Sequence, residues 1–267
     1  MEIIKKVANT KLVEEMFRRL LTVKNRKFKQ TKELTVVGDS HTSFFSGNQK
    51  LIWRRLTYHT IYQNKNIGTI DYAPTRYQNI KIYHIGAPLA YNINKYNTGN
   101  LGREKVEYLI DNGYINENSQ VMVCLGEIDL RVHVLKQAEK AGKTKEEIVD
   151  SILDNYMAFL HFLKSKGLKP IVWGPVASQI DGEQLYPDYP YYGSEADRNR
   201  ATAYFNNCMK QRCDKHQMGF VSIFEDLIDE NYKTKTKYFF DGCHLGQNAM
   251  EFAMTKLKDV LGFTYKK

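Results

Sequence analysis

The stretch that decides the fold is Leu34-Thr35-Val36-Val37-Gly38-Asp39-Ser40-His41. Its first half is a short apolar run of the kind that forms a buried β-strand, and the glycine and polar residues after it end the strand. Four more such runs follow, at residues 80–85, 121–125, 170–174 and 219–223. Between the later runs the apolar residues recur with helical spacing, notably from Glu146 to Lys166 and from Arg198 to His216.

Strands and helices that alternate in this way predict an α/β fold, with a parallel sheet of about five strands and helices on both faces. The chain has 267 residues, 42% of them hydrophobic, which is within the range of one domain with one large core. We therefore expect a single α/β domain over residues 31–267. Residues 58–77 are polar and irregular, and the pattern assigns them no role.

A basic segment, residues 1–30, precedes the first strand and carries an apolar stripe with helical spacing. The stripe consists of Val13, Met16, Phe17, Leu20 and Leu21. A helix of this kind either packs on the domain or contacts a protein partner or an anionic membrane surface. Both alternatives stay open.

The charge balance is basic, with 39 Lys and Arg against 30 Asp and Glu and a formal net charge of +9. Such a balance favours anionic partners. Apart from the stretch Lys24–Lys29 the lysines are scattered, and no nucleic-acid-binding motif accompanies them. We therefore expect a solvated basic surface and no nucleic-acid partner.

The cysteines and the hydropathy pattern indicate the cellular compartment in which the protein is expected. Four cysteines, at positions 124, 208, 213 and 243, form no CxxC pair, and the apolar surroundings of Cys124 indicate a buried thiol. No run of about 18 apolar residues occurs, so we expect no transmembrane segment. These features together predict a cytoplasmic protein.

The residues that follow the predicted strands are polar or glycine-rich. Because parallel strands place their carboxyl ends at one edge of a sheet, and ligands of open α/β folds bind there, these residues are candidates for a site. They are Asp39-Ser40-His41, Gly86-Ala87-Pro88, Gly126-Glu127-Ile128-Asp129 and Pro175-Val176-Ala177-Ser178.

Ser40 follows the first strand at a turn that can expose its hydroxyl and aim backbone N–H groups at a bound oxygen. Asp-Ser is also an ordinary helix-capping sequence, which is the structural alternative. Near the other end of the chain, Asp241 and His244 lie three residues apart in one turn. A hydroxyl needs a base and an orienting carboxylate to act as a nucleophile, and these two side chains are of the required types.

Four blocks of the sequence, in order, resemble those of the SGNH (GDSL-type) hydrolases. They are Gly38-Asp39-Ser40, Gly86, Gly126-Glu127-Ile128-Asp129 and Asp241-x-x-His244. The resemblance implies a three-layer α/β/α, flavodoxin-like domain with Ser40, Asp241 and His244 as a catalytic triad. It also implies an acyl-enzyme intermediate and an oxyanion hole formed by the Ser40 and Gly86 N–H groups and an asparagine side chain.

The sequence departs from the family pattern at Ile128, which stands where the asparagine is expected and whose side chain donates no hydrogen bond. Loss of one oxyanion donor costs about 10²–10³ in kcat, so the change implies a slow enzyme, a replacement donor or a protein that only binds. Arg131 either reaches the site or pairs with Glu127 or Asp129. Asn92 and Asn94 are other candidate donors.

Further candidates for substrate binding surround this constellation. They are Asp39, His41, Glu127, Arg131 and Tyr189. Tyr189 belongs to a proline-stiffened aromatic loop, residues 186–192, which suits stacking on sugar rings or else folds its tyrosines onto its own surface. His41 and His84 at strand ends are either substrate contacts or structural histidines.

These features predict a serine esterase or O-acyltransferase that acts on an acylated small molecule or glycan, with O-acetyl groups on a carbohydrate or polysaccharide precursor as the expected substrate. The alternative is a non-catalytic glycan- or anion-binding protein on the same scaffold. No nucleotide, flavin or metal motif is present in the sequence, so we expect neither a cofactor nor a metal site.

Overall fold

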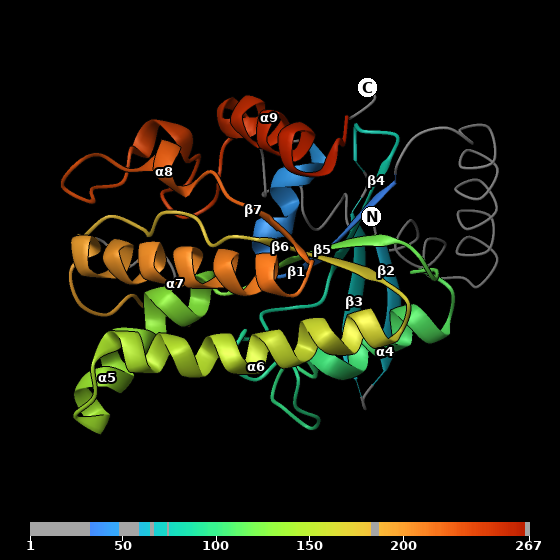
Figure 1. Ribbon diagram of the computed structural model, residues 1–267, viewed down its shortest axis with the longest axis horizontal. Coiled ribbons are helices and arrows are strands. Elements are labelled where there is room, and N and C mark those ends of the chain that lie inside the picture. The colour runs from blue at the N-terminus through green and yellow to red at the C-terminus, as the bar shows by residue number, and fades with distance from the viewer. Residues whose placement is uncertain (1–32, 48–58, 65–66, 74, 183–186, 265–267) are drawn as a thin grey trace, which may run out of the picture. The chain divides into compact units, whose positions relative to one another are not determined.

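The computed structural model describes residues 33–47, 59–64, 67–73, 75–182 and 187–264. In this part of the chain one seven-stranded sheet has the strand order β2-β3-β4-β1-β5-β6-β7 (Figure 1). The predicted N-terminal helical segment, residues 1–30, lies outside the described residues. Its predicted contact with a partner or a membrane surface therefore stays a prediction.

Five strands form the parallel part of the sheet, and each corresponds to one of the five apolar runs. They are β1 (Leu34–Gly38), β4 (Ile80–His84), β5 (Gln120–Cys124), β6 (Lys169–Trp173) and β7 (Gly219–Val221). Strands β1, β4, β5 and β6 are nearly continuously buried, as expected of strands covered on both faces. The predicted α/β class is confirmed.

Two further strands correct the predicted strand count and the all-parallel sheet. Strands β2 (His59–Asn64) and β3 (Gly68–Ala73) form an antiparallel hairpin that pairs with β4. They lie within residues 58–77, which the sequence left without structure. In β3 only Ile70 and Ala73 are buried. A hairpin of this kind has no continuous apolar run, so a prediction based on such runs does not find it.

Helices cover both faces of the sheet and give the expected three layers (Figure 1). One face carries α4 (Gly102–Asp111), the π-helical turn η3 (Asp129–Val134), α5 (Leu135–Ala141), α6 (Lys145–Ser165) and α7 (Glu195–Lys215). The other carries η1 (Ser40–Ser46), α8 (Phe224–Leu227) and α9 (Met250–Leu261), with the short turns η4 (Thr236–Tyr238) and η5 (Gln247–Ala249) leading into α9.

The two long helices show why these segments become helical. Helix α6 begins at a reciprocal capping box between Thr144 and Glu147 and buries the predicted stripe that includes Tyr156 and Leu160. Helix α7 begins at Ser194, whose hydroxyl accepts the Asp197 N–H. Packing of these apolar stripes against the sheet supplies most of the stability of the helices.

Backbone hydrogen bonds join the carboxyl ends of β1, β4 and β5. The Asp39 N–H donates to the Cys124 carbonyl at 3.3 Å, and the Ile85 N–H donates to the Gly38 carbonyl at 3.0 Å. The residues after β1, β4 and β5 therefore meet at one edge, as the parallel topology predicts. All four cysteines are free thiols. No helix among the described residues is long and apolar enough to cross a membrane.

Candidate active site

Ser40 lies at a tight turn between β1 and η1. The turn approaches β5 so closely that a Cβ added at Gly38 would lie 2.1 Å from the Cys124 carbonyl oxygen, so only glycine fits there. Asp39 then caps η1 by accepting the His41 N–H at 2.9 Å. The capping role thus belongs to Asp39, and it leaves the Ser40 hydroxyl partly exposed and free to face a second group.

Asp241 and His244 form a second turn, after η4. One oxygen of the Asp241 carboxylate accepts the backbone N–H groups of Cys243 at 3.1 Å and His244 at 2.7 Å. The other carboxylate oxygen lies 2.8 Å from Nδ1 of the His244 ring. The same carboxylate therefore fixes both the backbone of the turn and the orientation of the imidazole.

The fold brings these two turns together although they are 204 residues apart in the chain. Nε2 of His244 lies 2.7 Å from Oγ of Ser40. His244 is buried and Asp241 is half-buried, so both contacts are shielded from water. With a proton on Nδ1 held by Asp241, Nε2 presents its lone pair to the serine hydroxyl, which is the arrangement that activates a nucleophile.

The electrostatics keep His244 neutral. Burial lowers the pKa of the imidazole from its ordinary value, the hydrogen bond to Asp241 opposes this effect, and the charge of nearby His41 adds to it. The His41 and His244 rings lie 4.8 Å apart between centroids. At neutral pH His244 is therefore in the form that can accept a proton.

The two backbone donors expected for an oxyanion hole are unoccupied. Neither the Ser40 nor the Gly86 N–H donates to another group in the described part of the chain. Gly86 has a φ of 91°, a conformation that favours glycine. Both donors follow strands at the same edge of the sheet as the Ser40 hydroxyl.

The third donor is absent at the expected position because the Ile128 side chain is apolar and buried. Of the two asparagines proposed as replacements, Asn94 accepts a hydrogen bond from Arg103 at 2.5 Å, and Asn92 is half-buried. Asn100 also lies near Gly86, with its Oδ1, an acceptor, 3.8 Å from a Cβ built on that glycine. Asn100 has no sequence signal, since it lies in a loop between elements.

His41, Glu127 and Arg131 form a buried cluster near Asp39. Nε of Arg131 donates to one oxygen of Glu127 at 2.6 Å, and Nη2 donates to the other at 3.2 Å. Nε2 of His41 lies 3.4 Å from Glu127. The structure thus shows the alternative in which Arg131 pairs with Glu127. The arginine also donates to the Tyr189 carbonyl, so it supports the aromatic loop and presents no free charge to a substrate.

The same cluster explains two pKa shifts. The Arg131 guanidinium and His41 hold the pKa of the Glu127 carboxyl well below its usual range, against the opposing effect of burial. Burial raises the pKa of Asp39 to about 6, although His41 opposes the shift. Asp39 is buried and engaged as a cap, so the structure gives it a positioning role and no exposed surface for a substrate.

Asp129 fixes the loop that follows β4. Its carboxylate accepts the N–H groups of Ala90 at 2.8 Å and Tyr91 at 3.0 Å. Burial raises the pKa of this carboxyl to about 7, and the two backbone hydrogen bonds oppose the rise. Through these bonds the start of η3 holds the loop that carries Gly86 and the exposed ring of Tyr91.

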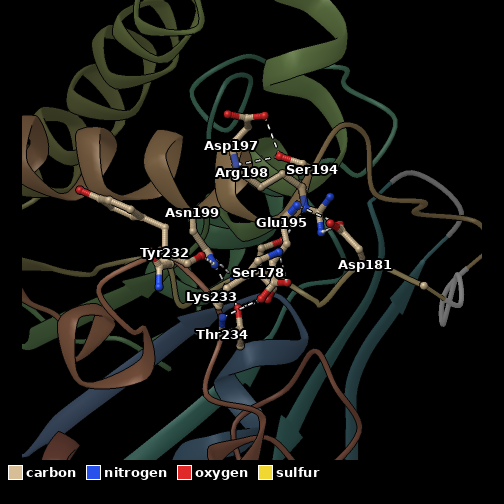
Figure 2. A network of polar contacts seen from close by, with 12 residues as sticks. Ser178, Asp181, Ser194, Glu195, Asp197, Arg198, Asn199, Tyr232, Lys233 and Thr234 are labelled. Carbon is tan, nitrogen blue, oxygen red and sulfur yellow. Dashed lines mark hydrogen bonds and ion pairs between the residues drawn. The ribbon is translucent and has the colours of Figure 1, made fainter.

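A second polar network joins residues 178–181, the start of α7 and residues 232–234 (Figure 2). Arg198 is fully buried and donates to Oγ of Ser178 at 2.9 Å and to the carbonyl of Gln179 at 2.6 Å. It also donates to the Gly193 carbonyl, at the end of the loop. Oγ1 of Thr234 donates to the Ser178 carbonyl at 2.7 Å, which ties the two segments together.

Among the described residues, one group offers metal-ligand atoms close together: His41, Cys243 and His244, whose ligand atoms lie within 4.8 Å of one another. Both ring nitrogens of His244 already contact Asp241 and Ser40. A metal ion bound there would have to displace one of these contacts. The geometry therefore fits a proton-transfer role for His244 better than ligation.

By sequence, the chain matches no protein-family model and no curated protein. By structure, it is similar to a provisionally assigned acylhydrolase of Bacteroides fragilis, with a TM-score of 0.53 and 14% identity over 86% of each chain. A GDSL-like lipase of Bacteroides thetaiotaomicron gives a TM-score of 0.53 and 11% identity, over 94% of this chain and 96% of that one. The chain thus has the fold of GDSL-like hydrolases, and the fold implied by the resemblance is confirmed.

Proposed function

We propose that this protein is a serine-dependent ester hydrolase or O-acyltransferase with Ser40, His244 and Asp241 as its triad. The observation that carries the proposal is the pair of contacts from the His244 ring, 2.7 Å to the Ser40 hydroxyl and 2.8 Å to the Asp241 carboxylate. A site that only binds has no physical need for a hydroxyl, an imidazole and an orienting carboxylate in this arrangement.

In the first step Oγ of Ser40 attacks the acyl carbonyl carbon and its proton passes to Nε2 of His244. The carbonyl π electrons move to oxygen, where the Ser40 and Gly86 N–H groups stabilise the charge. Collapse of this intermediate breaks the ester bond and returns the proton to the leaving alcohol. Water, or the hydroxyl of an acceptor, then attacks the acyl-enzyme and gives its proton to His244. The bond between Oγ of Ser40 and the acyl carbon breaks, and His244 returns the proton to Oγ.

We further propose that the substrate is an O-acetylated carbohydrate or polysaccharide precursor. Tyr91, in the loop after β4, is 42% exposed, and Tyr189, in the loop after β6, is 36% exposed. Both loops leave the carboxyl edge of the sheet, where Ser40 lies. Flat exposed rings on such loops suit stacking against the apolar faces of sugar rings.

The test is active-site labelling with a fluorophosphonate at about pH 8, where His244 is neutral. Wild-type protein is compared with Ser40→Ala, His244→Ala and Asp241→Asn, each checked for folding by circular dichroism. Ser43→Ala is the matched control, because its hydroxyl belongs to the same helix η1 but donates to the Ser40 carbonyl. We expect labelling of wild type and Ser43→Ala and none of Ser40→Ala.

A folded wild-type protein that takes up no label would favour the alternative, a non-catalytic glycan- or anion-binding protein. Labelling would lead to assays with acetylated sugars and with acceptor sugars. Release of free acetate would indicate a hydrolase, and its appearance on the acceptor would indicate a transferase.

A further inference from the structure

A buried lysine lies behind the proposed oxyanion hole. Lys105, in the first turn of α4, is buried, and its ammonium donates to the Ile85 carbonyl at 2.8 Å. The same nitrogen would lie 3.3 Å from a Cβ built on Gly86. The triad leaves this lysine without a role, and a buried lysine is uncommon unless a partner or a function retains it.

The hydrogen bond from Lys105 acts on the peptide unit that carries the Gly86 N–H. The Ile85 carbonyl and the Gly86 N–H belong to one peptide unit, and in a trans peptide these two groups point in opposite directions. The ammonium therefore lies on the carbonyl side, away from the N–H. That N–H has no acceptor among the described residues and lies at the strand edge beside Ser40.

A charged donor on a peptide carbonyl draws electron density toward the oxygen and makes the N–H of the same peptide a stronger donor. We propose that Lys105 is a positioning residue for the oxyanion hole, which holds and polarises the Ile85–Gly86 peptide and so offsets the missing donor at Ile128. This inference rests on the proposed function, because it concerns the same oxyanion.

The surroundings of Lys105 fit this role. The charged groups that face it are Asp71 of β3 and its own neighbour Glu104, and His84 of β4 lies 3.8 Å from Asp71. Burial lowers the pKa of Lys105 from its ordinary value, and the two carboxylates oppose the shift. A lysine whose only task is to pair with these acids would not need to contact the carbonyl that precedes Gly86.

The test is the turnover of p-nitrophenyl acetate from about pH 6 to about pH 10 by wild type, Lys105→Met, Lys105→Arg and Lys105→Gln. Lys258→Met, which removes an exposed lysine on α9, is the matched control for the loss of one charge. In the wild type we expect kcat to fall at alkaline pH, at a pH below the ordinary lysine range, because deprotonation removes the positive charge.

For Lys105→Met and Lys105→Gln we expect kcat to be about 10-fold lower, with KM changed less than about 2-fold and the alkaline fall absent. Lys105→Arg should restore kcat and move the fall beyond the range, because a guanidinium stays charged. The acid side of the profile, set by His244, should stay in place in every variant.

Three outcomes would overturn this inference and leave the proposed function intact. They are an active wild type whose kcat does not fall at alkaline pH, a Lys105→Met variant with wild-type kcat, and a loss of kcat that Lys105→Arg does not restore. The wild-type profile needs no variant, so the absence of an alkaline fall would overturn the inference even if the Lys105 variants do not fold. A wild type that neither turns over the ester nor takes up fluorophosphonate would overturn the proposed function, and this inference with it.

Discussion

The Asp241 carboxylate has two separate tasks at the scale of single residues. One oxygen holds the turn through the Cys243 and His244 N–H groups, and the other holds Nδ1 of the His244 ring. An asparagine at position 241 can still accept the two backbone N–H groups, but it cannot accept a hydrogen bond from Nδ1 with its NH₂ group. The contribution of ring orientation can therefore be measured apart from that of the turn.

We expect Asp241→Asn to lower kcat by about 10⁴, with a smaller effect on KM. An asparagine that keeps its oxygen on the backbone presents its NH₂ to Nδ1, so the ring proton moves to Nε2 and His244 cannot accept the Ser40 proton. The measurement is steady-state hydrolysis of p-nitrophenyl acetate. Asp259→Asn, on the exposed side of α9, is the control, and a kcat within about 10-fold of wild type for Asp241→Asn would contradict the prediction.

The pH dependence of catalysis should report the environment of His244. Its pKa is lowered, first by burial and also by the charge of His41, so kcat/KM should rise with pH through a value below the ordinary 6.5. In His41→Gln the repulsion from His41 is absent, and the rise should move to higher pH. The check is a pH–rate profile of both proteins, and an unmoved or downward-shifted rise in His41→Gln would show that His41 has no such effect.

Single residues differ in how far the sequence reveals them. Ser40, Asp241 and His244 follow recognisable blocks, and the fold places them in contact. Lys105 and Asn100 have no such signal, because an amphipathic helix and a loop contain many lysines and asparagines. Whether Arg131 pairs with Glu127 was left open by the sequence, since i,i+4 spacing allows the pair but does not determine the direction of a long side chain.

At the scale of elements, the loop after β6 depends on one buried arginine from α7. Arg198 donates to Ser178, Gln179 and Gly193, which flank the aromatic loop, and lies over the ring of Tyr191. Removing the guanidinium takes away hydrogen bonds to oxygens of the buried residues Ser178 and Gln179, which costs more than the loss of an exposed ion pair.

We expect Arg198→Met to lower the free energy of unfolding by about 3 kcal/mol, as removal of one partner from a buried charged network does. Urea denaturation at neutral pH measures this. Arg200→Met is the control on the same helix, because Arg200 makes an exposed contact with Asp197 at 3.4 Å and should change the unfolding free energy by less than about 1 kcal/mol. Equal effects of the two changes would show that the buried network does not stabilise the fold.

The strands were predictable where apolar residues follow one another in a buried run, and not where polar residues interrupt the run. The apolar runs located all five parallel strands, and periodicity located α6 and α7 to within about three residues. The β2–β3 hairpin was not predicted because its sequence mixes Thr, Gln, Asn and Asp with a few apolar residues. In β3 only Ile70 and Ala73 are buried, one in the core of each face of the sheet. Its signal was the alternation in Thr69-Ile70-Asp71-Tyr72, which marks a half-buried strand.

At the scale of the whole molecule, buried carboxyl groups at the strand edge link stability to pH. Burial raises the pKa of Asp39 from 3.8 to about 6 and that of Asp129 from 3.8 to about 7. For each carboxyl group the pKa in the folded state is above the pKa in the unfolded state. Its contribution to the free energy of unfolding is therefore fully present below the unfolded-state pKa, and it is lost as pH rises through the folded-state pKa. Glu127 has the opposite sign: its pKa is depressed, and its contribution is lost as pH falls below its ordinary 4.5.

These signs predict that Asp39→Asn becomes more stable relative to wild type as pH rises from about 4 to about 7. An asparagine oxygen can still accept the His41 N–H, so the cap on η1 is kept while the buried charge is removed. The gain should reach about 1–3 kcal/mol, since each unit of pKa shift corresponds to about 1.4 kcal/mol. Urea denaturation of both proteins at several pH values measures the difference. A difference that stays constant with pH would show that Asp39 titrates normally in the folded protein, and that the strand edge admits water to this carboxyl group.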